Sequence, residues 1–148
     1  MIRVQTEDFD IGAEVAALTA DRTDIGAVVT FSGLVRDANG GSLASLELEH
    51  YPGMTEKELA CIEREAHERW PLQASLIIHR VGKLLPGDNI VLVVAASAHR
   101  QAAFEAASFL MDYLKTRAPF WKREDTGGEA RWVDARESDG AAAAKWKA

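Results

Sequence analysis

The chain contains a single cysteine, Cys61, among its 148 residues. No disulfide can therefore form within it, and no thiolate cluster can hold a metal ion. On a helical wheel Cys61 falls opposite the apolar stripe of its predicted helix, among charged residues. That position favours an ordinary exposed thiol over a nucleophile. The histidines also lack the spacing typical of a metal site.

Long runs of one residue type are missing as well. The net charge is −6 and no long basic run occurs, which argues against a nucleic-acid-binding protein. The longest apolar stretches, such as IVLVVAA, are too short to span a bilayer, and the segment MIRVQTEDFD lacks the apolar core of a signal peptide. No glycine pattern matches a phosphate-binding loop. We therefore expect a cytoplasmic protein that binds neither nucleic acid nor a membrane.

What remains is an ordinary globular composition, with 47% hydrophobic and 27% charged residues. This length suits one domain with a full core, so we expect a single domain over residues 1–148. The alanine-rich end, at about residues 140–148, is expected to be frayed.

The apolar patterns predict strands, a helix, strands, a helix and strands, in that order. Residues 2–5 form an edge-strand candidate, and DANGGS (37–42) is predicted to be the turn of a hairpin between strands at 26–36 and 43–51. LPGD (85–88) joins two apolar strands by a type II turn, and DTGG (125–128) lies within a last hairpin. Because hairpins join most neighbouring strands, we expect an α+β fold with a mainly antiparallel sheet and a C-terminal hairpin.

Two main helices are predicted. Thr55 and Glu58 form a capping box for the first, which ends at Pro71, and Asp10 is expected to cap a further short helix. The second main helix covers about residues 98–117 and ends before Pro119. Its predicted inward stripe consists of Arg100, Phe104, Ala107, Ser108, Met111 and Leu114.

Lys115 follows Met111 by four residues, so it lies on the same side of the helix and points to the core or to a partner. An unpaired ammonium is costly in such a place. The alternative is a lysine that extends past the helix end, where the helix dipole favours a cation.

Lys122 lies in the strand FWKRE. Alternation puts Phe120, Lys122 and Glu124 on one face, which indicates a pocket wall where a lysine can transfer protons. A solvated basic strand is the alternative, and it is the favoured interpretation for Arg123.

SAHR (97–100) opens the long helix. With Ser97 as N-cap, the free N–H groups there would form an anion site, strengthened by His99 and Arg100; a plain surface helix start is the alternative. Arg100 and Lys115 are on the order of 22 Å apart along the helix. Either they serve separate purposes, or one site is shared between two copies of the chain.

The segments GAVVTFSGLVRD, HYPGM and MDYLKTRAPFWKRE, with others in order along residues 25–139, resemble the large, catalytic subunit of molybdopterin synthase. The resemblance implies an α+β fold of the α/β-hammerhead type. It implies conversion of cyclic pyranopterin monophosphate, precursor Z, into molybdopterin by dithiolene formation. The sulfur donor would be a thiocarboxylate on the C-terminal Gly-Gly of a ubiquitin-like small subunit. Two large subunits would form a central homodimer within a heterotetramer, with no metal or redox cofactor.

The resemblance also implies site residues. Lys115 and Lys122 match the two catalytic lysines of the family. The remaining matches are to substrate-binding positions: Leu34, Val35, Arg36, His99, Arg100, Arg123, Glu124 and, less securely, Arg136.

Two other classes stay open from the residues alone. A non-enzymatic module that docks a ubiquitin-like tail needs an apolar groove but not both lysines. A sensor of phosphate ligands needs Arg36 and His99 but no protein partner.

Overall fold

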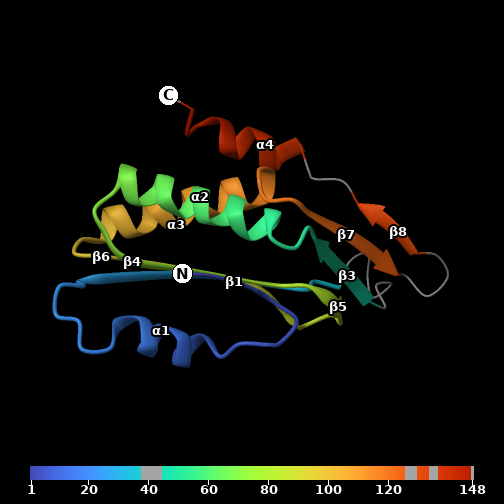
Figure 1. Cartoon of the computed structure of the whole chain (residues 1–148), viewed down its shortest axis with the longest axis horizontal. Coiled ribbons are helices and arrows are strands. Elements are labelled where there is room, and N and C mark those ends of the chain that lie inside the picture. The colour runs from blue at the N-terminus through green and yellow to red at the C-terminus, as the bar shows by residue number, and fades with distance from the viewer. Residues whose placement is uncertain (38–44, 126–129, 134–136, 148) are drawn as a thin grey trace.

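The computed structural model describes residues 1–37, 45–125, 130–133 and 137–147. It confirms the α+β prediction, with two sheets and helices packed against them (Figure 1). The strands are β1 (Ile2–Gln5), β2 (Ala27–Leu34), β3 (Ser45–His50), β4 (Leu72–Arg80), β5 (Gly82–Leu84), β6 (Asn89–Ser97), β7 (Phe120–Asp125) and β8 (Ala130–Val133), and the helices are α1 (Ile11–Thr19), α2 (Met54–Arg69), α3 (Arg100–Thr116) and α4 (Glu137–Ala144).

The central sheet has the order β1-β4-β6-β2. Its β4–β6 and β2–β6 pairs are antiparallel and β1 runs parallel to β4, so β1 is the predicted edge strand. On one face Ile77 and Val93 pack with α2 and α3, and on the other face Leu76 and Ile78 pack with α1. No helix in the described part of the chain is long and apolar enough to cross a membrane.

The end sheet, of order β5-β3-β7-β8, lies beyond one end of the central sheet (Figure 1). It contains the predicted C-terminal hairpin, β7 with β8. The predicted hairpin of the 26–36 and 43–51 strands is wrong, because β2 pairs with β6 whereas β3 pairs with β5 and β7. After β2 the chain leaves the central sheet, and Val35 is buried with Leu46 and Leu84 in the core of the end sheet. Turn residues specify a change of direction but not the strands that pair.

Two predicted helix caps are displaced. Asp10 does cap α1, since its side chain accepts the Ala13 N–H at 2.8 Å. The N-cap of α2, however, is Gly53 rather than Thr55, and Thr55 is buried within the first turn. The N-cap of α3 is His99 rather than Ser97. The Ser97 hydroxyl is buried and donates to the Pro71 carbonyl at 2.9 Å, so tertiary contacts take up the side chain that the local pattern assigned to a cap.

The buried face of α3 is rotated from the predicted stripe. Phe104 is 61% exposed and Ser108 is exposed too. The buried residues are Ala103, Ala106, Ala107, Phe109, Leu110, Tyr113 and Leu114. Alanines let the helix approach the sheet closely, but alanine alone does not distinguish core from surface in a sequence. Lys115 is exposed, so it does not point into the core.

The C-terminal end is packed rather than frayed. Helix α4 lies against α3, with Ala143 buried (Figure 1). The Trp146 ring makes edge contacts with Trp70 and Phe109, at centroid distances of 5.5 and 5.6 Å. Its indole N–H donates to Asp112 at 2.6 Å. A single tryptophan thus anchors an alanine-rich segment that has little apolar surface of its own.

We expect Trp146→Ala to lower the free energy of unfolding by about 2–4 kcal/mol, since it removes a packed aromatic ring. Chemical denaturation measures this value when the unfolding free energies of the variant and the wild type depend equally on denaturant concentration. Lys147→Ala, at an exposed neighbour, is the control and should be neutral. Equal stability of the two variants would contradict the anchoring role of Trp146.

The two sheets meet at a stacked pair of rings. His79, at the end of β4, lies 3.8 Å from Phe120, at the start of β7, with an interplanar angle of 17°. His79 is buried, and its Nδ1–H donates to the Arg80 carbonyl at 2.8 Å. Burial lowers the pKa of His79 from 6.5 to about 4, with contributions from the nearby charges of Lys115 and His50. The joint between the sheets therefore contains a neutral imidazole at physiological pH.

This depressed pKa predicts a pH-dependent stability. Between pH 6.5 and about 4 the unfolded chain binds a proton at His79 that the folded chain does not, so stability is full above pH 6.5 and falls as the pH drops. The loss contributed by this one group is on the order of 3 kcal/mol at pH 4. His79→Phe keeps a flat ring but cannot titrate, so its unfolding free energy should vary less with pH in this window.

Candidate active site

The two candidate lysines flank the turn from α3 to β7. The Arg117 N–H donates to the Tyr113 carbonyl at 2.7 Å and closes the last turn of α3, and β7 begins three residues later at Phe120. Lys115 is exposed, yet its charge contributes to the lowered pKa of the buried His79. The Lys115 ammonium is therefore near enough to disfavour protonation of the His79 ring.

Lys122 reaches the same place from β7. Strand alternation puts Phe120, Lys122 and Glu124 on one face, and His79 stacks on Phe120. Lys122 and Phe120 are two residues apart, or about 7 Å along the strand. The Lys122 ammonium is 3.9 Å from the Glu124 carboxylate. Lys122 and Glu124 therefore share the strand face of Phe120, the ring on which His79 stacks.

Arg123 is not part of this group. It lies on the opposite face of β7, directly across from Glu47 on β3, and the two charged groups are 4.0 Å apart. Its exposed side chain fits the solvated interpretation of this residue.

The segment of Leu34, Val35 and Arg36 is placed at the same end of the molecule as the lysines. β2 runs antiparallel to β6, and α3 follows β6 and returns along the sheet, so the end of β2 lies near the end of α3 (Figure 1). Val35 is buried and is held by two hydrogen bonds of 2.8 Å, from its N–H to Asp88 and from the Gly87 N–H. Leu34 and Arg36, on either side of this anchor, are exposed.

His99 and Arg100 lie at the other end. They begin α3, where β6 ends at Ser97 opposite Ala27. Both are exposed, and the rise of the helix puts Arg100 on the order of 22 Å from Lys115. Within one chain the fold separates this pair from the lysines. Arg136, the remaining candidate, falls outside the described residues.

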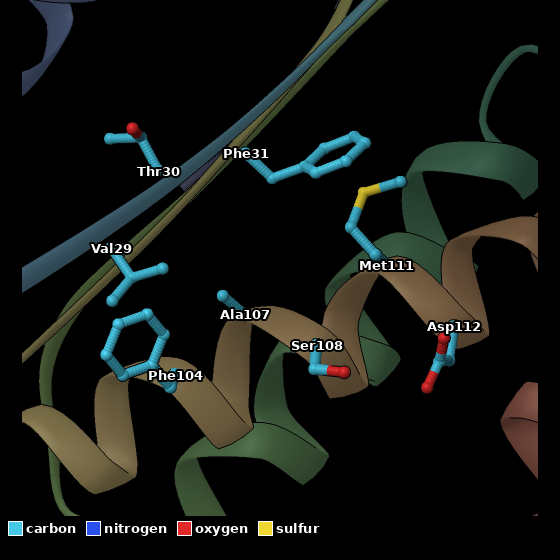
Figure 2. A pocket seen from close by; sticks show the side chains of 8 residues that line it. All are labelled: Val29, Thr30, Phe31, Phe104, Ala107, Ser108, Met111 and Asp112. Atoms are coloured by element: carbon cyan, nitrogen blue, oxygen red, sulfur yellow. The ribbon is translucent and has the colours of Figure 1, made fainter.

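An apolar groove runs between β2 and α3, with a volume of about 340 Å³. Figure 2 shows Phe104 next to Val29 and Met111 next to Phe31 along it. Phe31 is 42% exposed, and β2 is the outer strand of the central sheet. The groove and the free edge of β2 form a continuous surface, which we call the β2/α3 face.

The chemistry of the lysine end favours an anion. Three cationic side chains, Arg36, Lys115 and Lys122, lie at this end, and Lys122 is close to the Glu124 carboxylate. Among the described side chains, no group of three or more histidine, cysteine, aspartate or glutamate residues is placed to hold a metal ion. Such an arrangement can bind a phosphate or carboxylate and move protons next to it.

Sequence reasoning missed the residues that support the lysines. His79 and Thr55 are buried polar side chains at the two sides of the turn, and neither was assigned a role at the site. A signal for His79 existed, since it is the one polar residue in the apolar run LIIH. A histidine in a buried strand requires a specific environment.

Comparisons with known proteins show the family to which the chain belongs. A family model described as MoaE protein matches residues 4–117. The molybdopterin synthase catalytic subunit of Mesorhizobium japonicum is 65% identical over 148 residues, which cover 99% of this chain and 92% of that protein.

Solved structures match over similar lengths. The molybdopterin biosynthesis MoaE protein from Burkholderia ambifaria has a TM-score of 0.87 and 55% identity, covering 100% of this chain and 98% of that one. Molybdopterin synthase from Staphylococcus aureus has a TM-score of 0.82 and 32% identity, covering 89% and 96%. Because the family model and these relatives span most of the chain, the chain belongs to the MoaE family, which includes catalytic subunits of molybdopterin synthase.

Proposed function

We propose that this chain is the sulfurtransferase subunit that converts precursor Z into molybdopterin in the cytoplasm. In this reaction it takes sulfur from a thiocarboxylated, ubiquitin-like small subunit and builds the dithiolene without a metal or redox cofactor of its own. The observation that supports the proposal is that Lys115 and Lys122 flank the short α3–β7 turn, at the end of the molecule where Arg36 follows β2. The family membership supports the same reaction.

The charges at this end fit the proposed substrates. Precursor Z contains a cyclic phosphate, and the small subunit presents a carboxyl-derived group at its C-terminus. Both are matched by cations at the lysine end. We assign to Lys115 the stabilisation of negative charge as sulfur attacks and the carboxylate of the carrier leaves. We assign to Lys122, next to Glu124, the proton transfers that accompany sulfur addition and loss of water.

Lys115→Ala should abolish dithiolene formation while leaving the fold intact, because Lys115 is exposed and contributes little to the core. The measurement is a single-turnover assay with precursor Z and thiocarboxylated small subunit, with circular dichroism as the check on folding. Arg22→Ala removes an exposed cation on the loop after α1 and should react at the wild-type rate. Near-normal activity of folded Lys115→Ala would refute the assignment. The same assay separates the enzyme from a docking module or a phosphate sensor, since neither of these forms product.

We further propose that two copies of the chain form a homodimer that completes the site. His99 and Arg100 lie at the opposite end of α3 from the lysines, so one chain cannot apply both groups to one small substrate. The β2/α3 face supports self-association because it combines exposed Phe31 and Phe104 with an outer strand. A two-fold axis brings the start of one α3 near the end of the other.

Mixing two inactive variants tests the shared site. A dimer of one Lys115→Ala chain and one Arg100→Ala chain has one pocket with both defects and one with neither. Up to half of the activity per mixed dimer should therefore return. A site built within one chain would give two singly damaged pockets and no recovery. Native mass spectrometry confirms subunit exchange, so the absence of recovery in exchanged dimers would overturn the shared site.

A further inference from the structure

Thr55 makes a hydrogen bond to a segment outside its own helix. It lies in the first turn of α2 and is fully buried. Its hydroxyl accepts the Tyr51 N–H at 3.0 Å and donates to the Pro119 carbonyl, also at 3.0 Å. One side chain therefore joins the connection between β3 and α2 to the turn between α3 and β7.

The position of Pro119 gives this contact its importance. Pro119 follows Lys115 by four residues and precedes Lys122 by three, so its carbonyl lies in the short backbone segment that links the two lysines. Proline has no N–H to donate, which leaves the carbonyl as its backbone hydrogen-bonding group. A displacement of this peptide would move both lysines relative to each other.

Other contacts hold the same turn, but they are of a different kind. Arg117 pairs with Glu58 at 2.7 Å and Glu65 at 2.6 Å, and these side chains are about one-third exposed. Ion pairs of this exposure are screened by water and fix a backbone weakly. The Thr55 hydroxyl, by contrast, belongs to a fully buried side chain, and its loss would leave the Tyr51 N–H and the Pro119 carbonyl without this partner in a partly buried place.

We propose that Thr55 is a positioning residue for the proposed sulfur-transfer reaction. Its hydroxyl sets the backbone between Lys115 and Lys122 at the spacing that the reaction needs, without touching the substrate. The inference rests on the proposed function for its consequence in catalysis, and on the hydrogen bonds of Thr55 for its structural part.

The test uses a matched pair of substitutions. Thr55→Val keeps the shape and removes the hydroxyl, and Thr55→Ser keeps the hydroxyl and removes a methyl group. In the complex with thiocarboxylated small subunit and saturating precursor Z, we expect Thr55→Val to lower the single-turnover rate at least about tenfold, as small misplacements of catalytic groups do. Thr55→Ser should stay within about threefold of the wild type. If the valine variant does not fold, Thr55→Ala provides the same comparison with serine.

A stability control separates positioning from simple destabilisation. Ile78→Val trims a buried side chain on the α1 face of the central sheet, opposite to the face that packs against α2 and α3. It should lower the melting temperature yet react at the wild-type rate. Equal rates for Thr55→Val and the wild type, or equal losses in Thr55→Val and Thr55→Ser, would overturn the positioning role. So would an equal loss of rate in Ile78→Val.

A second measurement requires no substrate. Amide hydrogen exchange in peptides covering residues 115–124 should be faster in Thr55→Val than in the wild type and Thr55→Ser, while exchange in β6 stays the same. Unchanged exchange at the turn would refute the structural part of the inference. If the wild type itself forms no molybdopterin, the proposed function fails, and hydrogen exchange alone decides whether Thr55 holds the turn.

Discussion

The stacking of His79 on Phe120 is the contact on which the lysine end depends. It is the point at which the last residues of β4, in the central sheet, meet the first residue of β7, in the end sheet. Phe120 lies between Lys115 and Lys122 in the chain. The angle between the two sheets therefore also affects the relative position of the two lysine side chains. A neutral imidazole suits this place because its ring packs as a flat surface while its Nδ1–H is satisfied by the Arg80 carbonyl.

The joint also explains how charge is arranged around it. Two cationic groups lie near this uncharged pair of rings, since the Lys115 charge acts on His79 and Lys122 shares the strand face of Phe120. The whole chain carries a net charge of −6, so this positive region stands against an acidic background. An anion that approaches the molecule is therefore attracted to one end rather than to its surface in general. Two anionic reactants can meet there only if each can reach the α3–β7 turn, either as a small molecule or as an extended peptide segment.

Much of the fold could be predicted from local patterns because those patterns have local causes. The apolar period of α2 placed Leu59, Ile62 and Ala66 in the core, and Asp10 caps α1 through a bond three residues away. Alternation in FWKRE put Lys122 and Glu124 on one face. The prediction failed where a distant contact decides the outcome. Ser97 and Thr55 look like caps in the sequence, but their hydroxyls bind Pro71 and Pro119.

Pairing and rotation of elements were harder to predict for a related reason. The turn signal after β2 shows that the chain reverses, but burial of Val35 in the end sheet decides where the next strand goes. On α3 several of the residues that face the sheet are alanines, which do not indicate a buried face in a sequence. The predicted buried face was therefore based on larger side chains such as Phe104, which is exposed. The tail looked frayed because its composition is mostly alanine, although Trp146 and the buried Ala143 pack it against the core.

The separation of the candidate site residues along α3 could be predicted from the sequence, because it depends only on the length of the helix. Helix α3 follows β6 and runs back along it in the opposite direction. The first residues of α3 therefore lie near the end of β6, and the last residues of α3 lie near the start of β6. This topology fixes His99 and Arg100 at one end and Lys115 at the other, and no rearrangement of side chains brings them together across a rigid helix of 17 residues. It also gives Arg36 its place, because β2 ends where α3 ends. A single chain thus has a helix start that is predicted to bind an anion and a helix end that bears a lysine, and these two ends serve different substrates or the same substrate in different copies. The exposed, apolar β2/α3 face runs along the helix between these two ends, and that continuity favours the second arrangement.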